Sequence, residues 1–252
     1  MKERTDALEI DRIAFFGRTF SEYTAMFGLD EELLRKGPML DCPGGASSFA
    51  AEAHLKGLDV TASDILYFLS ADELLAKGRR DIAHVFEKFD AASHLYTWTH
   101  YKDKAEVMAQ RTKALEGFIR DFERGKKEGR YVRAELPRLP FPDRQFSLVL
   151  SANFLFLYGD RMGFDFHIAC IRELLRVSSG EVRIFPFVGL DALPYPHLHE
   201  VITALRGEGV SSEILPVDFE FQRGANQVLR LKAKSNIPPS ADHALQTCHT
   251  WQ

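Results

Sequence analysis

The segment from Met39 to Ala50 contains the residues whose types and spacing best suit binding chemistry. It reads MLDCPGGASSFA: a short apolar run ends in Asp41, the pair Gly44 and Gly45 follows, and small residues open a helix. Glycine permits a sharp turn and has no Cβ to block a ligand, and the free N–H groups at a helix start can face that ligand. This order predicts a strand, turn and helix against which a nucleotide-like ligand presses.

A second short strand, VTASD at residues 60–64, also ends in an acid, Asp64. An acid at this position is suitably placed to bind a ribose diol. The turn itself narrows the choice of ligand, because a dinucleotide turn needs three glycines in the pattern G-x-G-x-x-G. When the pattern is started at Gly45, its second and third glycine positions hold Ser47 and Ala50. Two of the three glycines of a dinucleotide turn are therefore missing. Asp41 instead suits a ligand that carries a cationic group.

The turn resembles the first motif of the class I S-adenosylmethionine-dependent methyltransferases, which reads roughly D-x-G-x-G-x-G. In that frame the chain has Asp41, Pro43, Gly45 and Ser47. One of the three glycines is therefore retained, and Gly44 is added beside it. The departure leaves open whether the turn still supports turnover.

The segment from Tyr131 to Leu150 resembles the third and fourth motifs of the same family. Glu135 stands at the place of the acid that lies near the adenine amino group, LPF at 139–141 matches the turn, and Phe146 opens the next strand. Ser147 departs from the usual Asp, a residue that commonly supports the fold rather than the chemistry.

This resemblance implies an α/β fold: a doubly wound, mostly parallel seven-stranded sheet that ends in an antiparallel hairpin, with N-terminal helices and a helical insertion after the second strand. It also implies that S-adenosylmethionine binds across the carboxyl ends of the strands. Asp41, Asp64 and Glu135 would then meet its amino group, ribose and adenine. The full set of expected cofactor-binding residues is Asp41, Cys42, Pro43, Gly44, Gly45, Asp64, Ile65, Glu135, Leu136, Ser151 and Asn153.

Strand and helix patterns alternate along the chain, which predicts the elements of such a sheet. We expect strands at 38–42, 58–63, 131–134, 146–151 and 181–187, a closing hairpin of 213–221 with 226–232, and helices at 46–56, 72–88, 102–124, 164–177 and 198–207. One or two helices are expected within 6–36. Three parts follow: an N-terminal helical cap (1–36), a methyltransferase domain (37–234) with an insertion at about 66–130, and an irregular tail (235–252).

Composition agrees with one enzyme domain in the cytoplasm. The 252 residues are 45% hydrophobic and 27% charged, which suits a single globular domain. A net charge of −4 and a pI near 6.2 argue against a general nucleic-acid or membrane-surface binder. No apolar run reaches membrane-spanning length. The three cysteines are far apart and lack metal-ligand spacing, so we expect no metal; the oligomeric state stays open.

Three residues are candidates for a general base: His167 first, followed by Tyr101 and His100 of the insertion. Methyl transfer from a sulfonium is an in-line displacement that depends mainly on alignment, so no catalytic triad is expected, and a base is needed only for a protonated acceptor. His167 opens the helix before the fifth strand, on the expected ligand side, and Tyr101 lies in the insertion. A lone histidine is also a common core residue, and that alternative for His167 stays open.

Aromatic residues predict where the methyl acceptor binds. The insertion contains HLYTWTHY at 94–101, and NFLFLY at 153–158 follows the fourth strand. Residues 90–130 are expected to form a helical cover over the carboxyl edge of the sheet, although the same aromatics could simply attach the inserted helices. The candidate acceptor-binding residues are Trp98, Tyr101, Phe154, Tyr158 and Arg183.

Two residues are candidates for binding the carboxylate of the cofactor. Arg18 lies in an N-terminal region that could cover the cofactor, and Asn153 follows the fourth strand. A solvated helix charge and an ordinary turn residue are the respective structural alternatives. The function expected from all these residues is methyl transfer to a small organic or peptidic acceptor. An inactive protein that binds S-adenosylmethionine or another adenosine ligand is the alternative, followed by an NAD(P)-dependent oxidoreductase.

Overall fold

A seven-stranded sheet forms the centre of the protein in a computed structural model that describes residues 6–233. The strand order is β3-β2-β1-β4-β5-β7-β6. The strands are β1 (Met39–Asp41), β2 (Val60–Asp64), β3 (Tyr131–Arg133), β4 (Phe146–Ala152), β5 (Ser178–Phe185), β6 (Val210–Pro216) and β7 (Gln227–Ala233). The first five pair in parallel, and β7 pairs antiparallel with both β5 and β6. The expected fold class is confirmed; the expected tail (235–252) lies outside the described residues.

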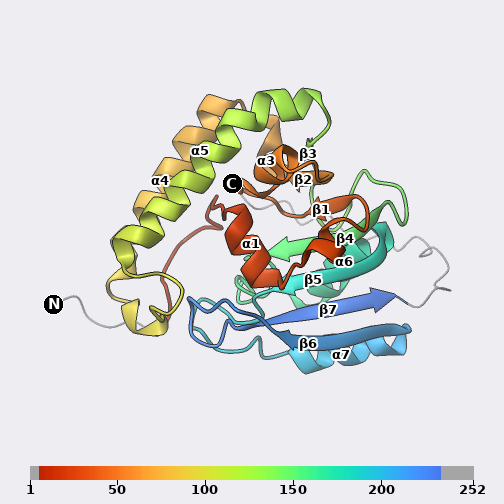
Figure 1. Ribbon diagram of the computed structural model, residues 1–252. Helices are drawn as coiled ribbons and strands as arrows, with labels where there is room; N and C mark the ends of the chain where they lie inside the picture. The colour runs from red at the N-terminus through yellow and green to blue at the C-terminus, as the bar shows by residue number, and fades with distance from the viewer. Residues whose placement is uncertain (1–5, 234–252) are drawn as a thin grey trace.

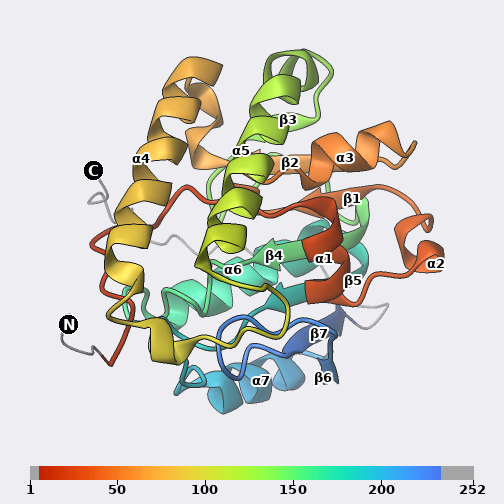
Figure 2. The ribbon, with the colours of Figure 1, turned by 60° about the vertical axis from the view of Figure 1, so that its left-hand side comes forward.

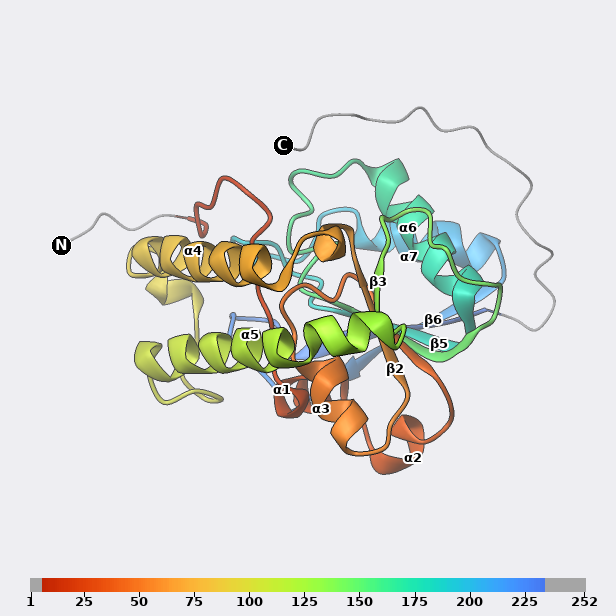
Figure 3. The same ribbon diagram turned by 90° about the horizontal axis from the view of Figure 1, so that it is seen from above.

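Helices cover both faces of the sheet and one of its ends. They are α1 (Phe20–Phe27), α2 (Glu31–Leu34), α3 (Phe49–Leu55), α4 (Ala71–Phe89), α5 (Lys104–Lys127), α6 (Phe164–Val177) and α7 (Leu198–Gly207), with 3-10 turns η1 (Ile65–Phe68) and η2 (Ser93–Leu95). Seen from above, α1 and α3 lie on one side of the strands, and α6 and α7 lie on the other (Figure 3). The insertion helices α4 and α5 lie side by side at one end of the sheet (Figures 1 and 2).

Polar caps define where the helices begin. Thr19 and Glu22 form a capping box at α1, and Ser70 and Glu73 form another at α4. In each box the side chains satisfy N–H groups that the first helical turn leaves unpaired. Asp103 caps α5 by accepting the Glu106 N–H. These signals explain why the two long helices of the insertion begin where they do.

The N-terminal helix prediction is correct for only part of its range. Residues 6–19 contain no helix, and α1 and α2 account for the helical part of 6–36. Between Ala14 and Thr19, buried and half-buried residues alternate. A period of two belongs to an extended chain, whose side chains point alternately to opposite sides. The segment from Ala14 to Thr19 is therefore a strap laid across the domain, and we call it the N-terminal strap.

The closing hairpin is shorter than its sequence pattern predicts. β6 ends at Pro216 rather than at Phe221, because the following backbone pairs elsewhere. The Thr97 N–H donates to the Phe221 carbonyl at 2.7 Å, and Tyr96 forms an isolated antiparallel bridge with Gln222. The loop from 217 to 226 thus binds the insertion instead of extending the sheet.

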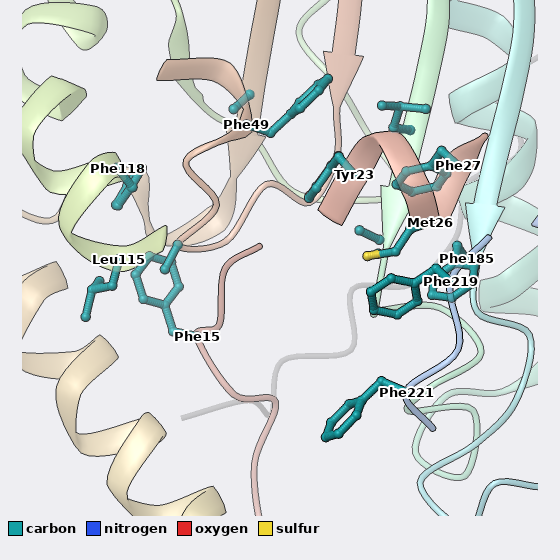
Figure 4. Packing of buried hydrophobic residues seen from close by; sticks show 14 of the residues in the cluster. Phe15, Tyr23, Met26, Phe27, Phe49, Leu115, Phe118, Phe185, Phe219 and Phe221 are labelled. Atoms are coloured by element: carbon teal, nitrogen blue, oxygen red, sulfur yellow. The ribbon is translucent and has the colours of Figure 1, made fainter. Parts of the chain in front are cut away.

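Two apolar clusters, one on each face of the sheet, stabilise the fold. In the cluster under α1, the ring of Tyr23 stacks on Phe49 at 4.5 Å between centroids, and Phe27 meets Phe185 edge-on at 6.2 Å. Figure 4 shows these rings together with Phe219, which lies 5.8 Å from Phe185. α1 is therefore fixed over the carboxyl end of β5. Among residues 6–233, no helix is long and apolar enough to cross a membrane.

Candidate active site

The carboxylate at the end of β2 holds the glycine turn that follows β1. Oδ2 of Asp64 accepts the Gly45 N–H at 3.0 Å, and Oδ1 accepts the Leu66 N–H at 2.9 Å. Burial raises the pKa of Asp64, against the effect of these two N–H donors. Each carboxylate oxygen accepts about two hydrogen bonds, so both oxygens retain capacity for a ligand hydroxyl. Asp64 and Ile65 line the large cavity described below.

Both glycines of the turn are required by their surroundings. Gly45 has φ +53°, and a Cβ there would lie 2.6 Å from the Phe16 carbonyl oxygen. A Cβ on Gly44 would lie 2.7 Å from the Tyr67 hydroxyl. That hydroxyl donates to the Gly45 carbonyl at 2.8 Å. The turn is thus packed against the protein on one side and open to the cavity on another.

The N-terminal strap occupies the start of α3. The Ala46 N–H donates to the Phe16 carbonyl at 3.0 Å, and the Ser48 N–H donates to the Arg18 carbonyl at 3.1 Å. A Cβ on Gly17 would lie 1.8 Å from the Ala46 carbonyl oxygen, so only glycine permits this approach. These two N–H groups were expected to face a ligand; they bind the chain's own carbonyls instead.

Asp41 lies beneath the turn and does not reach the cavity. Its carboxylate is fully buried and accepts the Tyr23 hydroxyl at 2.9 Å. Burial raises the pKa of Asp41 well above its usual range, and the nearby charge of Asp64 acts in the same direction. A Cβ on Gly44 would lie 3.4 Å from Oδ2 of Asp41. The structure therefore separates Asp41 from any ligand in front of the turn by the turn itself.

Arg18 and Asn153 meet at the other side of the turn. Nη2 of Arg18 lies 3.5 Å from Oδ1 of Asn153, and Nη1 lies 3.2 Å from the Tyr101 hydroxyl and 3.5 Å from Glu22. Asn153 follows β4 directly and has φ +51°, a conformation that Asn adopts more readily than most residues. Both Arg18 and Asn153 line the cavity. The three polar contacts of Arg18 are long, so the guanidinium keeps capacity for another acceptor.

A second arginine, from α5, already pairs with the carboxylate beside Arg18. Arg111 is 2% exposed and donates to Oε1 of Glu22 at 2.5 Å, to the Tyr101 hydroxyl at 2.6 Å and to the Gly17 carbonyl at 2.9 Å. Burial works to raise the pKa of Glu22, but the charges of Arg111 and then Arg18 hold it well below its usual range. Two cations therefore share one carboxylate, and this cluster has an excess positive charge.

These groups line one part of a cavity of about 2240 Å³, which also extends past α6 to Arg144, Ser178 and Val210 at the opposite edge of the sheet. The carboxyl ends of β1, β2, β3 and β4 contribute to its wall through residues 42–45, 64–66, 134–138 and 152–154. Cys42, Pro43, Glu135, Leu136, Phe154 and Tyr158 are among the lining residues expected from the sequence. Beyond Arg18 the wall becomes aromatic and includes Phe86, Phe89, Tyr96, Phe219 and Phe221.

Ser151 and Tyr158 contribute less than expected. The Ser151 side chain is 1% exposed and does not line the cavity, and its hydroxyl has no hydrogen-bond partner among the described residues. Tyr158 lines the cavity, but its hydroxyl accepts the Ala14 N–H at 3.1 Å. Tyr158 thereby attaches the N-terminal strap to the segment after β4.

His167 lies outside the cavity. It is fully buried, with Nδ1 2.9 Å from the Gly163 carbonyl and Nε2 3.1 Å from the Leu155 carbonyl. The ring packs at 4.6 Å on Tyr195. Since both nitrogens face backbone carbonyls within the core, the geometry agrees with the structural alternative and leaves no nitrogen for an acceptor proton.

Arg183 also has a structural environment. Its Nε donates to Glu181 at 2.6 Å, and its Nη1 donates to the carbonyls of Phe27 and Gly28. A buried arginine on an interior strand needs such partners. Arg183 connects β5 to the end of α1 and does not line the cavity.

Within the insertion, the two expected acceptor residues lie in different surroundings. Trp98 is 42% exposed, touches Phe89 and Phe221 edge-on, and does not line the cavity. Tyr101 is buried and its hydroxyl contacts Glu22 and Arg111. Burial raises the pKa of Tyr101, so Tyr101 retains its proton at neutral pH and is not poised as a base.

Sequence reasoning missed Glu22, Arg111, Tyr23 and Tyr67. The spacing of Thr19 and Glu22 is a readable capping box, and it marks the start of α1. Nothing local indicates that Glu22 also pairs with Arg111 of α5. No group of three or more metal-ligating side chains occurs in the described part of the chain.

Comparison with known proteins identifies one close relative. The chain is 32% identical over 226 residues to the uncharacterized protein MJ0045 of Methanocaldococcus jannaschii. The aligned residues cover 89% of this chain and 98% of that protein. The chain belongs to the family of that protein. No protein-family model matches the chain. The strand order, with an antiparallel β7 between β5 and β6, is that of the class I S-adenosylmethionine-dependent methyltransferase fold.

Several solved methyltransferase structures are similar at low identity. A TehB-like enzyme of Corynebacterium glutamicum is 13% identical, with 83% of this chain and 88% of that chain covered and a TM-score of 0.44. A putative methyltransferase of Methanococcus maripaludis is 13% identical, with 87% and 92% covered and a TM-score of 0.42. The glycopeptide N-methyltransferase MtfA is 12% identical, with 86% and 88% covered and a TM-score of 0.47.

Proposed function

We propose that this protein is a cytoplasmic methyltransferase that uses S-adenosylmethionine to methylate a small organic or peptidic acceptor. One observation carries the proposal. A single cavity at the carboxyl ends of the parallel strands contains a buried carboxylate, Asp64, on one side and an incompletely paired guanidinium, Arg18, on the other. The donor has matching groups at its two ends, a ribose diol and an α-carboxylate.

Each part of the donor is assigned to residues that line this cavity. The ribose hydroxyls would donate to the free lone pairs of Asp64. The carboxylate would accept from Arg18 and from the Asn153 amide, whose Oδ1 lies 3.5 Å from Arg18. Charge-assisted bonds of this kind contribute about 1.5–3 kcal/mol each. The adenine would lie beside residues 134–136, after β3.

The residues of the chain have positioning tasks in this reaction. When bound, S-adenosylmethionine supplies a methyl carbon that the sulfonium already activates. Asp64 and Arg18 fix the two ends of the donor and thereby the direction of its sulfur–methyl bond, on which an in-line displacement depends. The N-terminal strap and the aromatic wall keep water away from that bond. None of the residues that line the cavity within 6–233 is a histidine.

A binding experiment tests the proposal and its two alternatives. We expect calorimetric titration to show that S-adenosylmethionine and S-adenosylhomocysteine bind, and that NADP⁺ does not. Asp64→Asn should weaken both by at least about tenfold, because one amide oxygen cannot replace two carboxylate oxygens. Asp59→Asn is the matched control, since Asp59 is exposed at the other end of β2. Binding of NADP⁺ alone, or equal effects of both substitutions, would reject the assignment.

Activity is separated from binding in a second step. Incubation with ¹³C-methyl-labelled S-adenosylmethionine and a small-molecule cell extract should yield a labelled product detectable by mass spectrometry. The Asp64→Asn variant should yield much less of it. Intact binding without any labelled product would favour a protein that only binds the adenosine ligand.

A further inference from the structure

Among the seven tyrosines of the chain, one differs from the rest in its hydroxyl group. Six have a hydrogen-bond partner for that group: Tyr23, Tyr67, Tyr101, Tyr131, Tyr158 and Tyr195. Tyr96 has none within the described residues, although the residue is only 8% exposed. The oxygen itself is not among the buried polar atoms that lack a partner, so it is accessible from the open space beside it. Tyr96 lines the cavity, so a ligand there can supply the missing partner.

The ring of Tyr96 is held rigidly by its neighbours. It lies 4.7 Å from Phe89 at 29° and 4.7 Å from Phe221 at 33°. Trp98 meets Phe221 edge-on from outside the cavity at 5.9 Å. The backbone of Tyr96 bridges to Gln222. A side chain fixed in this way presents its hydroxyl at a defined point, as a recognition group must.

We call the aromatic part of the cavity the Tyr96 chamber: Phe86, Phe89, Tyr96, Phe219 and Phe221, all buried and all lining the cavity. Its only polar side-chain atom is the Tyr96 hydroxyl. Arg18 connects the chamber to the donor site, because its guanidinium lies 5.8 Å from the centre of the Phe219 ring. Burial raises the pKa of Tyr96 despite the nearby charge of Arg18, so the hydroxyl stays protonated and can both donate and accept.

We propose that the Tyr96 chamber binds the methyl acceptor, and that this acceptor is a small, flat aromatic amine whose amino N–H donates to the Tyr96 hydroxyl oxygen. The inference rests on the proposed function and gives its acceptor a chemical class. Stacked and edge-on aromatic walls favour planar rings. The aromatic side chains offer few hydrogen-bonding partners, which disfavours compounds with several polar groups, because such compounds would lose their water without replacement.

The proposed attack needs no base, because the acceptor is a nitrogen nucleophile. An aryl amine can donate an N–H to the Tyr96 oxygen while its nitrogen lone pair stays free to attack. Its lone pair forms the new nitrogen–carbon bond while the methyl carbon–sulfur bond breaks. The electron pair of that bond stays on sulfur, which becomes a neutral thioether, and the positive charge passes to the acceptor nitrogen. An aryl ammonium product then releases its proton to water.

The test uses 1-naphthylamine and naphthalene, two flat bicyclic probes that differ in one amino group. Their dissociation constants are measured by ligand-observed NMR on the full chain with saturating S-adenosylhomocysteine. We expect both to bind. The ratio of the two constants should shift against 1-naphthylamine by roughly three- to tenfold in Tyr96→Phe. Tyr195→Phe, which removes a hydroxyl next to His167 outside the cavity, should keep the wild-type ratio.

The possible outcomes separate this inference from the proposed function. If S-adenosylhomocysteine binds but the ratio is equal in wild type and Tyr96→Phe, or neither probe binds, the inference is wrong and the donor site stands. If the probes bind with a Tyr96-dependent ratio in a protein that binds no donor, the chamber stands and the proposed function fails. Displacement of S-adenosylhomocysteine by 1-naphthylamine would place the probe in the donor site and overturn the inference.

Discussion

At the scale of single residues, buried charges distinguish this site from an ordinary strand edge. Asp41 and Asp64 end neighbouring strands, and both are buried with raised pKa values. Glu22 is buried too, but the charge of Arg111 lowers its pKa. Burying an ionisable group without a full set of partners costs stability. Under the proposed function, a bound ligand offsets this cost at Asp64. At Asp41, the buried carboxyl secures the position of Tyr23 beneath the turn.

The raised pKa of Asp41 predicts how folding stability depends on pH. The folded protein keeps this proton to a higher pH than the unfolded chain does, so stability falls as pH rises from about 4 toward the folded-state pKa. The slope for one such group approaches about 1.4 kcal/mol per pH unit. Asp41→Asn should remove the contribution of this group to the pH dependence. The free energy of unfolding of the variant, measured in urea, should therefore fall less steeply between pH 5 and 7 than that of the wild type.

Asp59→Asn provides the control for this measurement. Asp59 is exposed, so the substitution should leave the wild-type slope unchanged. Asp64 remains in both variants and contributes its own slope to each. Parallel stability curves for wild type and Asp41→Asn would show that Asp41 titrates normally in the folded protein.

At the scale of elements, the N-terminal strap is the part that brings distant segments together. Its carbonyls bind the start of α3, and Arg111 of α5 binds the Gly17 carbonyl. Tyr158, after β4, binds the Ala14 N–H. Three elements thus converge on one extended segment, and Arg18 is positioned in its middle. The insertion therefore supports the segment that carries Arg18 as well as the aromatic wall.

Replacing Arg111 tests this dependence on α5. Arg111→Met leaves Glu22 buried beside a single, more distant cation, and we expect a loss of about 3–5 kcal/mol in the free energy of unfolding. Arg120→Met, an exposed position on the same helix, should change it by less than about 0.5 kcal/mol. The double variant Arg111→Met/Glu22→Gln should recover much of the loss. Equal effects of Arg111→Met and Arg120→Met in urea unfolding would contradict the role of the buried pair.

Local sequence patterns were sufficient to predict most elements but not the N-terminal strap. The strands ending in Asp41 and Asp64 are short apolar runs, and α6 and α7 have clear helical spacing, so their positions follow from periodicity. The apolar residues between 10 and 16, which run into the strap, also fit a helix. The backbone decides otherwise, because the strap's carbonyls at Phe16 and Arg18 accept the N–H groups of Ala46 and Ser48. Such tertiary contacts leave no signature in a local pattern.

The same limit applies to the site residues. The strand-end positions of Asp64 and Asn153 could be read from the sequence, because parallel strands end at one edge. The sequence could not show to which side of its element a side chain points or which residues pack over it. His167 was expected on the ligand side and lies in the core, whereas Tyr96 was one of several aromatics in the insertion and lines the cavity.

At the scale of the whole molecule, the sheet separates two apolar cores and leaves its carboxyl edge to the cavity. Elements from across the chain form that cavity: the strap, the turns after β1 to β4, the insertion and the loop between β6 and β7. α4 and α5 stand at this end of the sheet (Figure 1). The architecture therefore brings Asp64 and Arg18 to the wall of one cavity, and Arg18 lies next to the Tyr96 chamber.

A crystal structure of the protein with S-adenosylhomocysteine tests this arrangement most directly. We expect the ribose hydroxyls within hydrogen-bond distance of the Asp64 carboxylate and the ligand carboxylate at Arg18, with the sulfur facing the Tyr96 chamber. Gly44 and Gly45 should pack against the ligand. A ligand whose ribose lies away from Asp64, or whose sulfur faces away from the chamber, would contradict the account, as would an empty cavity at saturating ligand concentration.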